Sequence, residues 1–143
     1  MPFTGNFTCN TFKVGILDGT FNFGTGTSDV YKIALYTNAA TLNQNTTEYT
    51  TDGESSGGDY TAGGQEITAT VQTQDTASGS IVYVNFSSPS WTGAITARGA
   101  LIYKAGANGA ICVLDFGNDK TSANTFTVTM PQNTSTSALI RLA

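Results

Sequence analysis

A cluster of carboxylates lies in a glycine-rich stretch of the chain, and oxygen ligands of this kind are those that Ca²⁺ prefers. The cluster consists of Asp52, Glu54 and Asp59. Its spacing differs from that of an EF-hand loop, and no glutamate stands where the closing bidentate ligand would be needed. We therefore interpret these residues as a solvated turn and predict no metal site.

Nucleophilic catalysis would require a serine, threonine or cysteine beside a general base. The chain has no histidine, the commonest base, so a carboxylate or a lysine would have to replace it. Asp115 is the strongest candidate because it lies in an apolar strand at 113–116. A buried aspartate needs a cationic partner such as Arg98, Lys104 or Lys120, and we interpret Asp115 as a strand residue that is ion-paired or exposed. No pair of carboxylates suits glycoside hydrolysis, so we predict no catalytic residues, no enzyme activity and no cofactor.

Aromatic side chains that gather on a surface can stack against sugars. The chain has one tryptophan and six tyrosines. The same residues are also needed to fill the core of a β-sheet domain, so both interpretations stay open. The residues concerned are Trp91, Tyr36, Tyr49, Tyr60, Tyr83 and Tyr103.

The composition excludes several classes of protein. Charged residues make up 11% of the chain, with ten acidic and six basic residues and a formal net charge of −4. Six scattered basic residues cannot neutralise a phosphate backbone, so we expect no nucleic-acid partner. No run of about 18 apolar residues is present, so we expect no transmembrane helix and no membrane partner. The N-terminus also lacks the basic and apolar regions of a signal peptide.

The length of 143 residues fits a single domain with a core of its own. Such a domain does not depend on disulfides or metals to fold. Cys9 and Cys112 lie far apart in the sequence, and nothing indicates an oxidising compartment. We expect two reduced, partly buried thiols.

Residues 1–29 are expected to form an irregular N-terminal arm with one short helix. Asn10 is a suitable N-cap, and Gly19 is placed to end the helix. Between them, three apolar residues recur at helical spacing: Phe12, Ile16 and Leu17.

Residues 30–143 are expected to form a domain of short β-strands separated by turns rich in glycine and asparagine. In the first strand, at 30–37, Tyr31, Ile33 and Leu35 alternate with more polar residues and predict a half-buried strand. A long polar segment at 38–65 follows, with a short strand at 48–51. Further strands are predicted at 67–72, 80–86, 95–103, 111–116, 126–130 and 138–142, the first two of these as a hairpin, with a loop at 118–124.

About eight strands with long connections predict an all-β fold. We expect a two-sheet antiparallel sandwich, jelly-roll-like in the first instance and immunoglobulin-like in the second, with a short N-terminal helix or arm.

The N-terminal arm is the best candidate for an interface with a partner. Five phenylalanines lie within its first 23 residues: Phe3, Phe7, Phe12, Phe21 and Phe23. Exposing all five rings would be a liability for a soluble monomer. The rings must therefore be buried either against the chain's own domain or against a partner, and the sequence does not distinguish the two.

Four stretches together resemble a family of small structural proteins of tailed bacteriophages. They are FKVGILDGTFNF at 12–23, VYKIALYTNAATL at 30–42, residues 49–64 with their TAGG ending, and WTGAITARGALIYKAGANGAICVLDFGNDK at 91–120. The resemblance extends over 12–143 and is to capsid decoration, or cement, proteins such as the jelly-roll cement protein of the Bordetella podophage. These stretches carry no catalytic chemistry, and the residues before Phe12 lie outside the resemblance.

The resemblance implies a virion protein that is made in the bacterial cytoplasm and lies on the capsid exterior. Its partner would be the major capsid protein, whose subunits it would bridge, and symmetry suggests a homodimer or homotrimer. The alternative is a glycan- or host-surface-binding module of a phage tail fibre or baseplate. Decoration predicts exposed apolar patches near the phenylalanines, whereas glycan binding predicts aromatic side chains gathered in a groove.

Overall fold

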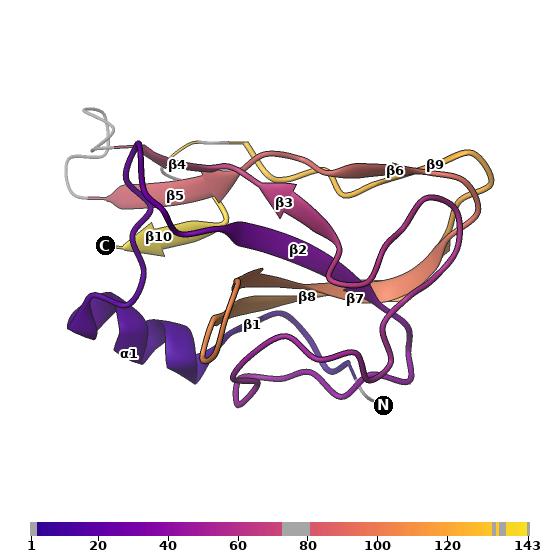
Figure 1. Ribbon diagram of the computed structural model, residues 1–143, viewed down its shortest axis with the longest axis horizontal. Helices are drawn as coiled ribbons and strands as arrows, with labels where there is room; N and C mark the ends of the chain where they lie inside the picture. Colours follow the sequence, from indigo (N-terminus) through magenta and orange to yellow (C-terminus); the bar gives the residue numbers. More distant parts are fainter. Residues whose placement is uncertain (1–2, 73–80, 133, 135–136, 143) are drawn as a thin grey trace.

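A computed structural model of the protein describes residues 3–72, 81–132, 134 and 137–142. In these residues the chain forms one short helix and ten strands, and every strand pairing is antiparallel (Figure 1). The protein is therefore mostly β, as the alternating patterns predict. The elements are β1 (Phe7–Thr8), α1 (Asn10–Asp18), β2 (Tyr31–Tyr36), β3 (Gln65–Ile67), β4 (Ala69–Gln72), β5 (Val82–Phe86), β6 (Ser90–Thr92), β7 (Thr96–Lys104), β8 (Ala110–Thr121), β9 (Thr125–Thr127) and β10 (Ile140–Leu142).

The strands lie in two layers. One layer is a five-stranded sheet with the order β1-β8-β7-β2-β3. Over one face of it lie a three-stranded sheet, β10-β5-β4, and the strand pair β6-β9 (Figure 1). The sequence predicts one strand at 67–72, but the strand is divided at Thr68 between the two layers. The N–H of Thr68 donates to Ser87 Oγ (2.9 Å). The predicted hairpin is present as β4 paired with β5, and residues 73–80 between them lie outside the described residues.

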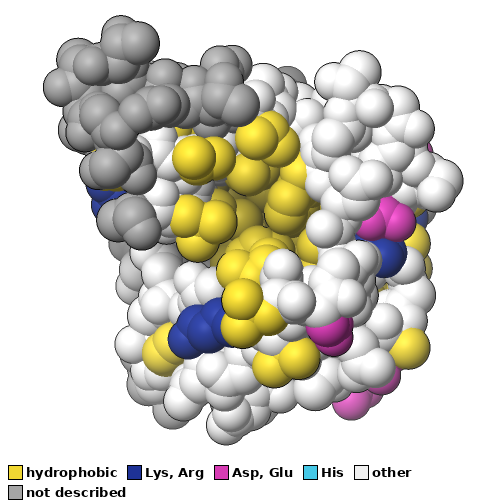
Figure 2. Space-filling view, turned by 90° about the vertical axis from the view of Figure 1, so that its left-hand side faces the viewer, with side chains coloured by type: hydrophobic (Ala, Val, Ile, Leu, Met, Phe, Trp, Pro, Cys, Tyr) yellow, Lys and Arg dark blue, Asp and Glu magenta, His cyan; other side chains and the backbone are white. Residues whose placement is uncertain are grey.

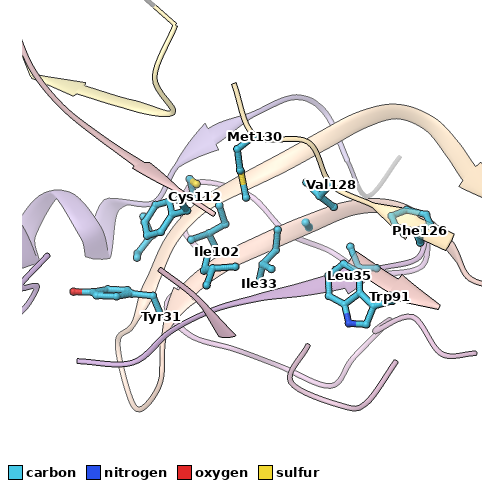
Figure 3. Packing of buried hydrophobic residues seen from close by; sticks show 14 of the residues in the cluster. Tyr31, Ile33, Leu35, Trp91, Ile102, Cys112, Phe126, Val128 and Met130 are labelled. Carbon is cyan, nitrogen blue, oxygen red and sulfur yellow. The ribbon is translucent and has the colours of Figure 1, made fainter. Parts of the chain in front are cut away.

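The main core lies between the two layers (Figure 3). The five-stranded sheet supplies Tyr31, Ile33 and Leu35 from β2, which confirms the face predicted by their alternation. The opposite layer supplies Trp91 and Phe126, which face each other across the β6-β9 pair. Side chains of both layers thus cover one another and exclude water.

A second core covers the other face of the five-stranded sheet, and the sequence analysis does not anticipate it. Ala34 and Tyr36 of β2 pack there with Leu101 of β7 and with Leu42, which belongs to the loop at 37–64. This loop crosses beneath the sheet in Figure 1. The alternation predicts a half-buried β2, but both faces of the strand are covered, so only Lys32 remains partly exposed.

The helix ends where the sequence predicts and begins one residue from the expected cap. Cys9, rather than Asn10, holds the N-cap position, with an extended backbone and no side-chain cap. Gly19 adopts the left-handed conformation (φ 83°) that closes a helix. Leu17, one of the three apolar residues at helical spacing, is 89% exposed. Adjacent residues of a helix lie about 100° apart, so Leu17 turns away when Ile16 faces the core.

The N-terminal segment is part of the same packed unit as the strands. β1 pairs with β8, with Phe7 opposite Val113, and α1 places Phe12 in the main core. Residues before the boundary predicted at residue 29 are therefore packed against strands that follow it.

Three predicted element boundaries differ from the structure. The ladder between β7 and β8 continues to the pair Thr96–Thr121, so β8 includes most of the loop predicted at 118–124. No strand forms at 48–51, where the chain makes only an isolated bridge nearby, between Tyr36 and Glu54. The strand predicted at 126–130 is shortened to β9, at 125–127.

Candidate functional site

The predicted solvated turn is exposed at Asp52 and Asp59, but Glu54 is held by hydrogen bonds within the fold. Its carboxylate accepts hydrogen bonds from Tyr49 Oη (2.6 Å), Tyr60 Oη (2.7 Å) and the N–H of Gly63 (2.7 Å). Asp59 accepts a hydrogen bond from a backbone N–H of β6 (2.8 Å). Among the described residues, no three His, Cys, Asp or Glu side chains are grouped so that they could hold a metal ion.

Tyrosines fasten the loop at 37–64 to the five-stranded sheet. Tyr36 Oη donates to the carbonyl of Thr50 and Tyr103 Oη to that of Gly63, both at 2.7 Å. The rings of Tyr49 and Tyr103 stack with their centroids 5.2 Å apart. Burial, together with the hydrogen bond to the nearby carboxylate, raises the pKa of Tyr49 to about 12. These phenols therefore act as neutral donors that hold the loop. We call the face of the five-stranded sheet that lies under the loop at 37–64, around Tyr36, Leu101 and Tyr103, the covered face.

Asp115 has the cationic partner that a buried aspartate requires. Arg98 Nε lies 3.1 Å from Asp115 Oδ1, and both side chains are nearly buried. Burial alone would raise the pKa of Asp115, but hydrogen bonds from Gly117 N–H (2.8 Å) and Arg98 outweigh it and lower the pKa. The ion-paired interpretation is confirmed, and an ionised carboxylate held in this way is a weak general base.

The two cysteines are not joined in a disulfide, and both are buried, more fully than the partly buried thiols that the sequence predicts. They lie on opposite faces of the five-stranded sheet, Cys9 in the second core and Cys112 in the main core. Burial raises the pKa of Cys9 to about 11 and also raises the pKa of Cys112. Thiols with raised pKa values are poor nucleophiles at neutral pH.

The aromatic side chains proposed as a sugar platform are used inside the protein. Trp91 is buried, and so are four of the six tyrosines, all of which the structure describes. Tyr49 and Tyr60 are half-buried, and both of their hydroxyls bind Glu54. These residues leave no ring free for stacking against a sugar.

The N-terminal phenylalanines pack mainly on their own chain, which is one of the two alternatives that the sequence leaves open. Phe3 is buried in the second core, and Phe12 and Phe21 are buried in the main core. Phe23 is half-buried, and its ring lies 5.9 Å from that of Phe12. Phe7 is also half-buried, against the second core. Phe3 and Phe21 cannot meet a partner without leaving the core, whereas Phe7 and Phe12 border an open groove.

This groove lies between α1 and β10 and has a volume of about 550 Å³. Hydrophobic side chains gather in a hollow at this end of the molecule, as Figure 2 shows. The groove brings together three distant parts of the chain: α1, the start of β5 and the C-terminal segment. Its apolar lining consists of Phe12, Ile16, Ile81, Leu139, Ile140 and Leu142.

The three-stranded sheet extends its apolar face into the groove. Ile140 lies opposite Val84, and Leu142 lies opposite Val82. Residues directly opposite each other in an antiparallel pair point to the same face of the sheet. This face begins in the main core, against which Val84 and Ile140 pack, and it ends at the surface, where Leu142 is 52% exposed.

A narrower groove of about 180 Å³ continues from the first one and shares Thr8 and Leu139 with it. Phe7 and Leu114 are among the residues that line it. The two grooves run between β1, an outer strand of the five-stranded sheet, and β10, an outer strand of the three-stranded sheet. We call them together the seam groove.

The charged residues that line the seam groove are both cations. They are Lys13 of α1 and Arg141 of β10, and no carboxylate is among the described lining residues. Sequence reasoning misses this site, because its residues become neighbours only through the sheet topology.

Within the described part of the chain, no helix has the length and apolar character needed to cross a membrane. Comparisons of the chain with protein-family models, with curated proteins and with solved structures gave no match. A functional proposal therefore rests on the geometry above and on the resemblance noted in the sequence.

Proposed function

We propose that the protein is a structural component of a bacteriophage virion, which decorates and stabilises the capsid by bridging subunits of the major capsid protein. The observation that carries a protein-binding role is the seam groove, an apolar hollow that is open to the surface. Exposed apolar surfaces of this kind on soluble domains are typical of protein interfaces. The location on the capsid exterior follows from the resemblance, and the proposal includes no catalytic activity and no cofactor.

Bridging requires a second contact surface, and α1 offers one outside the groove. Val14 and Leu17 are both strongly exposed on this helix, and neither lines the seam groove. Two separate apolar surfaces suit a protein that touches two neighbours, either two capsid subunits or one subunit and a second copy of the chain. A homodimer or homotrimer at a local symmetry axis fits this arrangement.

The rigidity of the domain also supports the proposal. Both faces of the five-stranded sheet are covered, and hydrogen bonds to Glu54 fasten the long loop. A rigid domain loses little conformational entropy on binding. A protein that binds only the assembled shell stabilises that shell by mass action. We propose in addition that the two β layers form a jelly-roll-like sandwich.

The alternative, a glycan- or host-surface-binding module of a tail fibre or baseplate, has less support. The tyrosine and tryptophan rings on which a sugar would stack are buried or bonded to Glu54.

Quantitative mass spectrometry of purified virions tests the proposal, with the major capsid protein as the internal standard. We expect a copy number within a small factor of that of the capsid protein, and heads that release DNA at a lower temperature after the protein is stripped. A far smaller ratio would place the chain in the neck, tail or fibres and refute decoration. Absence from virions would refute both the capsid role and the tail-fibre alternative.

A further inference from the structure

The loop between β7 and β8, at 105–109, contains an asparagine followed directly by a glycine. Asn108 is the only asparagine of the chain that precedes a glycine, and it is exposed in a turn. Asparagine is a thermolabile residue, because its side-chain amide can react with the backbone nitrogen of the next residue. A glycine in the next position has no Cβ to hinder the approach of the two groups. This pair is therefore the position in the chain where the reaction meets the least steric hindrance.

The turn itself requires both residues of the pair. Asn108 has a φ of 57°, and no other residue except glycine has a positive φ in the described part of the chain. Asparagine tolerates this left-handed conformation better than most residues do. A Cβ added at Gly109 would lie 1.9 Å from the carbonyl oxygen of Lys104, so only glycine fits there. The backbone geometry of the hairpin thus retains the reactive pair.

The two reacting groups have no competing hydrogen bonds. Among the described residues, neither the side chain of Asn108 nor the N–H of Gly109 makes one. Asn45 provides a contrast, because it is also exposed in a turn but its Oδ1 accepts a hydrogen bond from Asn10 Nδ2 (3.1 Å). The residue after it is Thr46, whose branched side chain crowds the backbone nitrogen. Exposure alone therefore does not distinguish Asn108, whereas its free amide and the glycine that follows do.

We infer that Asn108 is a site of spontaneous deamidation, a chemical modification that alters the chain after it has folded. The nitrogen of Gly109 attacks Cγ of Asn108, and the new C–N bond closes a succinimide ring. The bond from Cγ to Nδ2 breaks, and the proton of the Gly109 N–H leaves with Nδ2 as ammonia. Water then adds to either carbonyl of the ring and opens it to aspartate or isoaspartate. Water is consumed, ammonia is released, and no atom is oxidised or reduced.

The product places a new carboxylate near an existing one. Asn108 lines a hollow of about 450 Å³ together with Val14 and Asp18 of α1, and no cation is among the described residues that line it. Like charges that share a hollow repel each other. In isoaspartate the main chain also gains a methylene group beside Gly109, whose carbonyl accepts the N–H of Lys104 (2.7 Å). Both changes loosen the contact between the loop and α1.

The modification also bears on the proposed function, although the reaction does not depend on that function. Val14 belongs to the exposed apolar surface of α1 and lines the same hollow as Asn108. A charge introduced beside an apolar contact has to lose its water when a partner binds, which opposes binding. If α1 contacts a neighbour in the shell, aged chains should therefore bind it less tightly than fresh chains do.

Incubation of the full chain tests the inference. Folded protein and protein unfolded in urea are held in parallel at mildly alkaline pH, digested with trypsin and analysed by mass spectrometry. The tryptic peptide 105–120 contains Asn108 and Asn118, and fragment ions separate the two positions. Enzymatic methylation identifies isoaspartate among the products. In the folded chain we expect Asn108 to convert at least about tenfold faster than Asn45, because attack by the glycine nitrogen meets a lower barrier.

Matched glycine variants assign the reaction to its residue. We expect the unaltered chain to accumulate a more acidic species in ion-exchange chromatography, and Asn108→Gly to abolish it. Glycine accepts a positive φ, so this variant keeps the turn. Asn45→Gly is the matched control and should accumulate the acidic species at the unaltered rate. Gly109→Ala is unsuitable, since its Cβ would collide with Lys104. Circular dichroism verifies that each variant is folded.

Three results would overturn the inference. Conversion of Asn108 in urea but not in the folded chain would show that the turn protects the pair. Conversion of Asn45 or Asn118 as fast as that of Asn108 would show that the glycine does not govern the reaction. Persistence of the acidic species in Asn108→Gly would place the modification elsewhere. The copy number in virions affects none of these results, so the proposed function and this inference fail separately.

Discussion

The covered face and the seam groove both present apolar side chains at a boundary of the five-stranded sheet, but they differ in what lies over them. On the covered face, residues of the same chain close a core around Tyr36 and Leu101. At the seam groove, Ile140 and Leu142 border a hollow that remains open. The chain thus covers one apolar face by itself and leaves the other open among the described residues.

The means of closure explain the difference. The loop at 37–64 forms no strand and is held by side-chain hydrogen bonds, such as those of Glu54 and of Ser55, whose Oγ donates to the carbonyl of Thr96 (2.9 Å). Ordering each backbone residue of a loop costs about 1–2 kcal/mol. Many specific contacts are therefore needed to hold such a cover. No comparable segment of the described chain crosses the seam groove.

The largest effect is expected from a glycine under the covered face. Gly64 has a φ of +76°, and a Cβ added there would lie 1.8 Å from the carbonyl oxygen of Ile33. We expect Gly64→Ala to lower the free energy of unfolding by more than about 3 kcal/mol in urea titrations. Gly19 is the matched control, since its φ is +83° but nothing lies within 4 Å of an added Cβ. Gly19→Ala should cost about 1 kcal/mol. Equal losses of unfolding free energy would show that an added Cβ is accommodated under the covered face as well as at an exposed helix end.

A smaller loss is expected when the carboxylate that holds the loop is removed. Glu54→Ala leaves three donors without their acceptor, and we expect a loss of about 2 kcal/mol of unfolding free energy. Asp52→Ala provides the comparison, because Asp52 lies in the same stretch but is exposed. Its replacement should change the stability by no more than about 0.5 kcal/mol. Similar values for the two variants would contradict the anchoring role of Glu54.

We expect acid to lower the free energy of unfolding through Asp115, which lies in the sheet beside the covered face. The seam groove has no carboxylate among its described lining residues, so we expect no such contribution from the groove. The folded state lowers the pKa of Asp115. The stabilisation is therefore complete above the unfolded pKa of about 4 and is lost as the pH falls through the lower folded value. We expect Asp115→Asn to flatten the fall in unfolding free energy below about pH 4. An unchanged pH profile would show that this ion pair does not contribute to acid unfolding.

The most sensitive comparison uses the two thiols as reporters of local opening. Cys9 lies under the covered face, whereas Cys112 borders the narrow part of the seam groove. Burial raises the pKa of both thiols, so both should react slowly with a disulfide reagent in the native protein. In the single variants Cys9→Ser and Cys112→Ser, we expect Cys112 to react faster than Cys9, because the open seam separates at lower free energy. Faster reaction of Cys9 would reverse the order of stability argued above.

The fold was predictable wherever the signal was local. Period-two alternation identified the core face of β2, and Gly19 marked the end of α1 because a left-handed residue is needed there. The covering loop could not be found in this way. Its contacts join residues far apart, such as Tyr103 and Gly63, and no periodicity encodes them.

The candidate site shows the same limit. The sequence identified an aromatic N-terminal segment but could not decide between burial in the domain and burial in a partner. Packing of Phe21 against Phe12 shows burial in the chain itself. The groove residues missed by the sequence analysis, Ile81 and Leu142 among them, lie far apart in the chain and meet through the pairing of β5 with β10.

The two ends of the described chain lie in different surroundings, which matters for fusion proteins. Phe3 lies in the second core beneath the five-stranded sheet, whereas Leu142 lies at the groove. A reporter or antigen joined ahead of Phe3 would project away from the groove. The same cargo joined behind Leu142 would stand at the mouth of the groove and obstruct it. A fused cargo that is to leave the groove accessible therefore belongs at the N-terminal side.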